Sequence, residues 1–226
     1  MYFFLNGGRD ERAVLKSSAA VELYKKIGIQ HILFIPFAIT EDYWQVLWHD
    51  NQDLFGMPAC DVRSLTMLDT DPHIIQQKIA WADCIYFPGG APMSLLKRVE
   101  DAGVTKLIRQ AIAIGSLKLL AGGSAGAMVM GSDCIIGNTE VKTVVTGLNF
   151  VADYVIDSHF GNRHRESRLL QILADRPHLK GMGIDEDTGV VLNDNLALQA
   201  VYGPGTVKVY HKTNIETYDS NFRFPT

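Results

Sequence analysis

The sequence has no long apolar run, few cysteines and no cluster of basic residues. Its apolar stretches all fall short of the ~18 residues that a membrane-spanning helix needs, and residues 1–5 lack the basic flank and cleavage site of a secretory signal. Lysine and arginine are dispersed and the formal net charge is -4, a pattern that argues against a nucleic-acid or membrane partner. We therefore expect a cytoplasmic protein that acts on a small polar substrate.

The cysteines Cys60, Cys84 and Cys134 are widely spaced and form no Cys-x-x-Cys pair. Their spacing indicates neither a disulfide framework nor a zinc site. We expect buried free thiols, which pack like small apolar side chains.

Strand-like and helix-like segments alternate over the first half of the 226 residues. Apolar runs predict strands at 2–5, 31–37, 62–68, 83–87 and 117–121, and helical spacing or start signals predict helices at 11–27, 41–50, 72–81, 92–100 and 103–114. This order predicts one α/β domain over 1–226 with a doubly wound, mostly parallel sheet, whose sites lie beyond the carboxyl ends of the strands. Glycine pairs at 7–8, 89–90 and 122–123 follow such strands and would line a pocket with backbone.

The pattern changes after residue 131. Short apolar pieces and one charged helix at 166–174 lead to strands at 189–192, 196–202 and 206–210. Gly203-Pro204-Gly205 separates the last two, so we expect a C-terminal β-hairpin that joins them.

A turn of small residues with one serine follows the strand at 117–121. The spacing Gly122-x-Ser124-x-Gly126 is typical of a nucleophile elbow, where a Cβ on either side would collide with the neighbouring strand and helix. A glycine-rich strand-to-helix turn that holds an anion would show the same residues, so both interpretations stay open.

A serine hydroxyl becomes a strong nucleophile when a base, most often a histidine held by a carboxylate, takes its proton. His159, His164 and His211 are the candidates among seven histidines. His159 ends a strand-like segment, where its side chain can face a pocket, and it is favoured. His211 follows the final predicted strand, where an α/β-hydrolase places its base, and it is the main rival.

The carboxylate that would orient the histidine stays open at this point. Glu140 lies in a polar loop after the serine turn, Asp157 lies two positions before the favoured histidine, and 185–187 form a later acidic cluster. Side chains two positions apart on a strand point the same way, which permits a contact between Asp157 and His159 without requiring it.

Three segments carry a family resemblance: GGSAGAMVMG at 122–131, the segment at 147–170 that contains HFGNRHRESRL, and GMGIDEDTGVVL at 181–192. In order and spacing they resemble peptidase family S51, the group of dipeptidase E and cyanophycinase. The resemblance implies a class I glutamine amidotransferase-like (flavodoxin-like) fold and a serine peptidase that works through an acyl-enzyme.

The resemblance also implies roles for individual residues. Ser124 would be the nucleophile, His159 the base and Glu140 the third member of the triad. The backbone amides of Gly90 and Ala125 would form the oxyanion hole, in which one donor is typically worth ~3 kcal/mol of transition-state stabilisation.

Substrate contacts are implied at Asp157, Ser158, Arg163 and Arg168. A guanidinium group suits a carboxylate because it donates two parallel hydrogen bonds. By analogy we expect hydrolysis of short peptides with an aspartyl residue next to the scissile bond, in Asp-X or β-aspartyl linkage. We expect a monomer or homodimer that needs neither metal nor cofactor.

The chain departs from the family where Ala91-Pro92 replaces the polar pair that usually follows the Gly-Gly turn. This change favours a short peptide over cyanophycin, a polymer of aspartate and arginine. Two other hypotheses stay open: an α/β-hydrolase-type esterase that uses Ser124 and His211, and a catalytically silent relative that binds a ligand at the turn.

Overall fold

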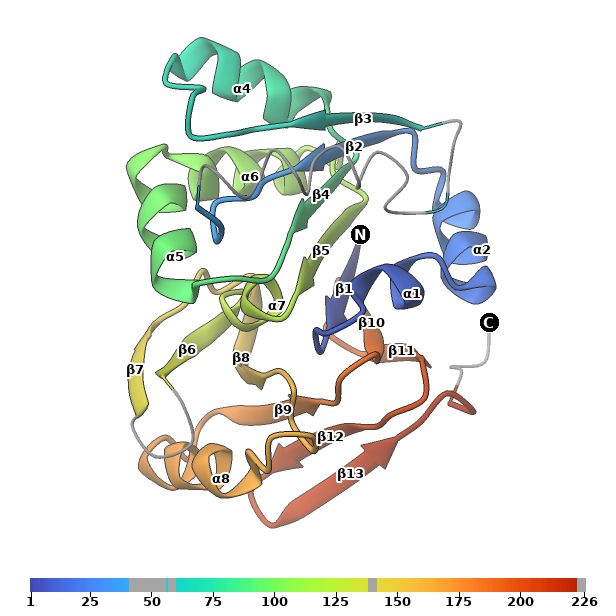
Figure 1. Ribbon diagram of the computed structural model, residues 1–226, viewed down its shortest axis with the longest axis vertical. Coiled ribbons are helices and arrows are strands. Elements are labelled where there is room, and N and C mark those ends of the chain that lie inside the picture. Colours follow the sequence, from blue (N-terminus) through green and yellow to red (C-terminus); the bar gives the residue numbers. More distant parts are fainter. Residues whose placement is uncertain (41–55, 57–59, 138–141, 223–226) are drawn as a thin grey trace.

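The computed structural model describes residues 1–40, 56, 60–137 and 142–222. The helix predicted at 41–50 and the carboxylate predicted at Glu140 lie outside these ranges. Helices and strands alternate along the chain and build two sheets, so the protein has an α/β fold (Figure 1). Each helix among the described residues is too short or too polar to cross a lipid bilayer.

The first sheet has seven strands in the order β11-β10-β1-β5-β4-β2-β3. Its parallel strands are β1 (Tyr2–Asn6), β2 (His31–Phe34), β3 (Asp61–Ser64), β4 (Cys84–Phe87) and β5 (Leu119–Gly123). The antiparallel strands β10 (Gly189–Asn193) and β11 (Leu198–Tyr202) extend it beyond β1. All residues of β4 and β5 are buried, as expected of central strands covered on both faces.

Helices cover both faces of this sheet. α1 (Glu11–Leu15) and α2 (Ser18–Ile27) lie on one face, and α4 (Pro72–Trp81), α5 (Pro92–Asp101) and α6 (Val104–Ala113) lie on the other (Figure 1). Successive strand residues point to opposite faces. Phe4 accordingly packs in the core cluster of Tyr24 on α2, and Phe3 in the cluster of Ile108 on α6.

The single helix predicted over 11–27 is wrong, because the chain forms α1 and α2 instead. Ser17 has φ -58° and ψ 143°, and its side chain accepts a hydrogen bond from the N–H of Ala20. A serine in this position satisfies an amide that has no partner within the helix. The second helix therefore begins at Ser18 and ends before Gly28, which has the left-handed conformation common after helices.

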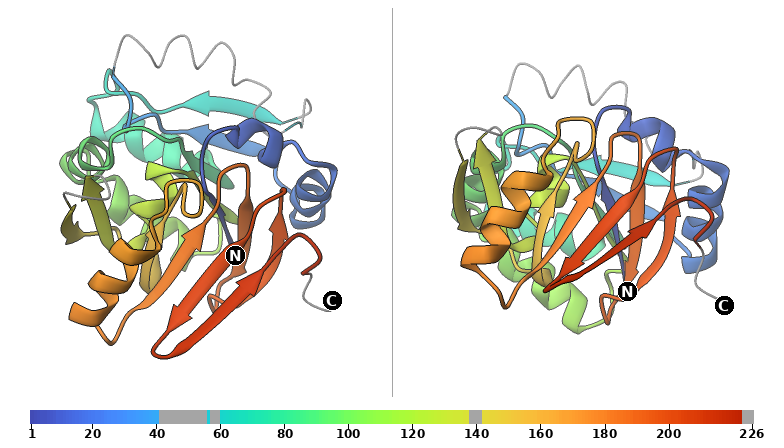
Figure 2. Two further views of the ribbon diagram at one scale, coloured as in Figure 1. Left: turned by 60° about the horizontal axis from the view of Figure 1, so that its bottom comes forward. Right: turned by 90° about the horizontal axis from the view of Figure 1, so that it is seen from below.

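Six strands from the chain after the serine turn form a second sheet in the order β13-β12-β9-β8-β6-β7. They are β6 (Gly131–Gly137), β7 (Lys142–Thr146), β8 (Val151–Asp157), β9 (Lys180–Ile184), β12 (Val207–His211) and β13 (Asn214–Tyr218). α8 (Glu166–Asp175) packs against β9 (Figure 2). The short α7 (Ala125–Met128) contacts strands of both sheets. The sequence predicted one sheet, because short apolar pieces do not reveal which strands they pair with.

The hairpin predicted across Gly203-Pro204-Gly205 is wrong. β11 pairs with β10 in the first sheet, whereas β12 pairs with β9 and β13 in the second. These three residues therefore carry the chain from one sheet to the other. Gly203 has φ 97°, and a Cβ there would lie 2.0 Å from the carbonyl oxygen of Asp187. The glycine is thus required by close backbone packing rather than by a hairpin turn.

The register of the parallel strands brings the three glycine pairs to one edge. Asn6 lies opposite Gly123, and Gly122 lies opposite Phe87. The segments that follow β1, β4 and β5 consequently leave the sheet side by side, as the sequence predicts.

Candidate active site

Ser124 lies at the apex of the turn between β5 and α7. Its φ of 45° and ψ of -109° place it in a strained region that non-glycine residues adopt mainly at functional sites. A Cβ on Gly122 would lie 2.5 Å from the carbonyl oxygen of Gly126, and a Cβ on Gly126 would lie 2.0 Å from the carbonyl oxygen of Phe87. A side chain at either position would collide with backbone atoms, so the turn requires glycine at 122 and 126, as the Gly-x-Ser-x-Gly spacing indicates.

His159 contacts this serine from the second sheet. It follows β8, and its Nε2 lies 2.9 Å from Ser124 Oγ. Its backbone N–H donates to the carbonyl oxygen of Gly7 at 2.8 Å, which ties the end of β8 to the loop after β1. Residues thirty-five positions apart therefore form a nucleophile and base pair in hydrogen-bonding geometry.

Glu186 is the carboxylate that contacts the histidine. Its Oε1 lies 2.8 Å from Nδ1 of His159, and its backbone N–H donates to Oδ1 of Asn162. Glu140, the residue that the resemblance implied, lies outside the described residues. Sequence reasoning placed Glu186 in an acidic cluster without singling it out.

The other acidic candidates have different partners. Asp185 accepts hydrogen bonds from the backbone of Gly161 and from Thr206. Asp157 is completely buried and pairs with Arg165 and Arg168. Because β8 and β9 are parallel neighbours with Asp157 opposite Gly183, the signal that would have found Glu186 is strand order, which the sequence does not show.

The environment of His159 favours its neutral form. Burial lowers the pKa of the imidazole, the hydrogen bond to Glu186 raises it, and the positive charges of Arg163 and Arg165 lower it, with a net shift below 6.5. A neutral imidazole can accept the proton of the serine hydroxyl. The three side chains together can therefore act as a nucleophile, a base and an orienting carboxylate.

A buried cluster of one aspartate and two arginines lies beside the Ser–His pair. Arg168 donates from Nε to Asp157 Oδ2 at 2.6 Å and from a second nitrogen to Oδ1, and Arg165 donates to Oδ1 at 3.2 Å. Burial raises the pKa of Asp157 against the opposing effect of both arginines. The two guanidinium groups outnumber the one carboxylate, and Nε of Arg165 is buried without a hydrogen-bond partner. Counted over the described residues, the cluster thus has one more positive than negative charge.

Most of the predicted site residues line one cavity of about 170 Å³. They are Gly90, Ser124, Ala125, Ser158, His159, Arg163 and Arg168. The Arg163 side chain is 52% exposed, and its Nε lies 3.8 Å from Glu186 Oε1. Ser158 donates its hydroxyl to the sulfur of Met128. Asp157 pairs with the arginines at the wall of this cavity, and Arg165, which was not among the predicted site residues, lines it.

His211, the rival base, is exposed at the end of β12 and pairs with Asn214 in the β12–β13 ladder. From Val207 to Tyr210, the residues of β12 pair with β9 residues from Ile184 back to Gly181. His211 therefore lies at the end of the second sheet opposite to the end from which the chain continues to Glu186. The side chain that Ser124 contacts is that of His159.

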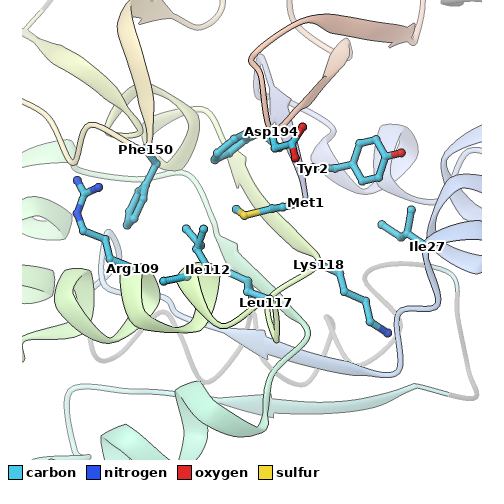
Figure 3. A pocket seen from close by; sticks show the side chains of 12 residues that line it. Met1, Tyr2, Ile27, Arg109, Ile112, Leu117, Lys118, Phe150 and Asp194 are labelled. Atoms are coloured by element: carbon cyan, nitrogen blue, oxygen red, sulfur yellow. The ribbon is translucent and has the colours of Figure 1, made fainter.

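A larger cavity of about 790 Å³ lies at the other ends of β1 and β5 (Figure 3). Tyr2, Arg109, Lys118 and Phe150 are among its lining residues. Asn6 lies four positions after Tyr2 on the strand, or about 13 Å at 3.3 Å per residue. The larger cavity is therefore remote from the serine. Over the described part of the chain, no group of three or more His, Cys, Asp or Glu side chains could hold a metal ion.

The model of peptidase family S51 matches residues 5–199. Among curated proteins, a cyanophycinase of Trichormus variabilis (strain ATCC 29413 / PCC 7937) is 37% identical over 138 residues, which cover 58% of this chain and 46% of the relative. A cyanophycinase of Geminocystis herdmanii (strain PCC 6308) is 33% identical over 163 residues, which cover 68% of this chain and 59% of the relative. The chain thus spans about half the length of the curated relatives that it matches.

Two solved structures share the fold. A peptidase from an acI-B1 Actinobacterium superposes with a TM-score of 0.72 at 22% identity, covering 100% of this chain and 96% of the other. A putative peptidase E protein from Listeria monocytogenes EGD-e gives a TM-score of 0.63 at 21% identity, covering 96% of this chain and 98% of the other. At these identities the likeness concerns the fold alone.

Proposed function

Because the chain belongs to peptidase family S51, we propose that it is a serine peptidase that hydrolyses short peptides with an aspartyl residue next to the scissile bond. The observation that carries this proposal is the continuous chain of contacts from Ser124 through His159 to Glu186, with 2.9 Å and 2.8 Å between the paired atoms. Such a chain is the arrangement that activates a serine hydroxyl.

The proposed reaction has two stages. His159 takes the proton of Ser124 as Oγ attacks the peptide carbonyl carbon, and the carbonyl oxygen gains the negative charge beside Gly90 and Ala125. The C–N bond then breaks, the amine leaves with the proton from His159, and an acyl-enzyme remains. Water, deprotonated by the same imidazole, attacks the ester and restores the serine. Glu186 orients the imidazole and stabilises its positive form.

The arginines around the cavity and the volume of the cavity support the proposed preference for an aspartyl residue. Two arginines share one buried aspartate beside the serine, and Arg163 adds an exposed positive charge at the mouth of the cavity. A substrate carboxylate suits this site, because guanidinium groups bind carboxylates through parallel, charge-assisted hydrogen bonds. A cavity of about 170 Å³ has room for a small acidic side chain rather than a large one.

The experiment is a screen of Asp-X dipeptides and β-aspartyl dipeptides against the matching Asn-X peptides and N-blocked controls. We expect turnover of an aspartyl peptide, little turnover of its asparagine counterpart, and none with Ser124→Ala. Equal turnover of aspartyl and asparaginyl peptides would contradict the acidic specificity. Turnover that survives Ser124→Ala would contradict the serine mechanism.

The curated relatives are named cyanophycinases, and the same screen should therefore include β-aspartyl-arginine. The single-domain organisation, the cytoplasmic location and the monomeric or homodimeric state stay predictions of the sequence.

A further inference from the structure

Glu11 lies directly beneath the serine turn, at the start of α1. A Cβ built on Gly123 would lie 2.1 Å from Glu11 Oε2, and one built on Gly89 would lie 2.8 Å from Oε1. The same point at Gly89 is 3.2 Å from the Cβ of Ser124. The carboxyl group therefore occupies the space that the missing side chains of both glycines leave, between the turn after β4 and the turn after β5.

Among the described residues, the hydrogen bonds to this carboxyl come from β4 and its turn. The hydroxyl of Tyr86 donates to Oε2, and the backbone N–H of Gly89 donates to the carboxyl group. Tyr86 is buried to 1% exposure and cannot move without disturbing the sheet. Glu11 thus joins a rigid strand, the Gly89-Gly90 turn and the serine turn through one side chain.

Gly90 directly follows Gly89 and has little conformational freedom of its own. It has φ 142°, and a Cβ there would lie 2.4 Å from the carbonyl oxygen of Ala38, so its backbone has little freedom to shift toward that side. The residue before it is the one that Glu11 holds. Because an oxyanion donor works only when it is aimed at the place where charge develops, the position of Gly89 decides whether the Gly90 amide can serve.

The carboxyl group is itself placed where a negative charge would be unfavourable. Burial raises the pKa of Glu11, and the hydrogen bonds from Tyr86 and Gly89 lower it, with a net increase above 4.5. An apolar side chain would fill the same space but would leave the N–H of Gly89 without this acceptor, which is costly when buried.

We propose that Glu11 is a positioning residue of this active site, which holds the Gly89-Gly90 turn against the serine turn so that the Gly90 amide faces the oxyanion. The inference rests on the proposed function, because it assigns a role in the same reaction. Glu11 touches neither the substrate nor the reacting atoms and acts through Gly89.

The test measures the rate of Ser124 labelling by a fluorophosphonate, whose phosphoryl oxygen needs the same amides as a peptide oxyanion. We compare wild type with Glu11→Ala, Glu11→Gln and Tyr86→Phe. Val14→Ala is the matched control, because Val14 is a buried residue of the same helix that lies in the α2-side core. Thermal unfolding is recorded for every variant.

We expect Glu11→Ala to label about tenfold to 100-fold more slowly than wild type. This is less than the roughly 100-fold to 1000-fold cost of removing one oxyanion donor, because the amide is displaced rather than lost. Glu11→Gln should stay within about threefold, because an amide oxygen can accept from Gly89 and its NH₂ can donate to Tyr86. Tyr86→Phe should lose less than Glu11→Ala, and Val14→Ala should lower the melting temperature without slowing the labelling.

Labelling of Glu11→Ala at the rate of Val14→Ala, or a Glu11→Gln rate as low as that of Glu11→Ala, would overturn the inference while leaving the proposed function intact. Wild-type protein that is neither labelled at Ser124 nor active on any aspartyl peptide would overturn both. The two failures are therefore distinguishable.

Discussion

Replacement of Glu186 by glutamine is the perturbation whose size the structure constrains best. The carboxylate and the imidazolium that forms during the reaction are 2.8 Å apart. At an effective dielectric of about 20 their attraction is about 6 kcal/mol. The side chains of His159 and Glu186 are 10% and 16% exposed, so water screens part of this attraction. We take about half of the attraction as the energy that the substitution removes. A loss of about 3 kcal/mol lowers kcat about 100-fold.

The assay is steady-state hydrolysis of the best aspartyl dipeptide as a function of pH, with Glu140→Gln as the matched comparison. The base is active only when His159 is neutral, so kcat/KM falls as the pH drops through its pKa. Glu186 raises that pKa, and its replacement should therefore move the acid limb to lower pH while the plateau falls. If Glu140→Gln causes the loss and Glu186→Gln does not, the reasoning is refuted.

Three further perturbations follow from the contacts around the site. Gly8→Ala should abolish turnover, because its Cβ would lie 2.5 Å from Cε1 of His159. Gly103→Ala is the control and should keep turnover, because Gly103 also has a positive φ but a Cβ there would meet nothing within 4 Å. Equal activities of the two variants would contradict this explanation. Asp157→Ala should lower the unfolding free energy by about 3–5 kcal/mol in denaturant titrations, because it removes the buried carboxylate that Arg165 and Arg168 both contact, and an unchanged midpoint would count against it. Arg163→Ala should raise KM for an aspartyl peptide about tenfold through one lost charged hydrogen bond, with kcat and the melting temperature unchanged; a fall in kcat alone would refute that role.

The sequence predicts the part of the site that depends on local backbone geometry. Small residues around Ser124 indicate a tight turn, and the glycines at 122 and 126 are required by backbone atoms that approach within 2.5 Å of where a Cβ would lie. Continuous apolar runs predict the parallel strands β1, β4 and β5, whose carboxyl ends must meet. His159 at the end of a strand-like segment follows the same logic.

The remainder depends on pairing between distant strands. Glu186 reaches His159 only because β8 and β9 are neighbours in a second sheet, and the sequence holds no local signal of that order. The crossing at 203–205 has the same origin, since a glycine-rich segment fits more than one arrangement. The break between α1 and α2 is local instead, because Ser17 caps the second helix. Glu11 escaped notice because an acidic residue in the first turn of a helix is ordinary.

The central claim is that Ser124, His159 and Glu186 act as one catalytic unit. Its most direct test is to compare kcat for the best aspartyl dipeptide in Ser124→Ala, in His159→Ala and in the variant that lacks all three side chains. When residues act as one unit, removing one of them already removes most of the rate enhancement that they give together. The triple variant should therefore be about as slow as either single variant. Losses that multiply, or substantial turnover in Ser124→Ala, would contradict the claim.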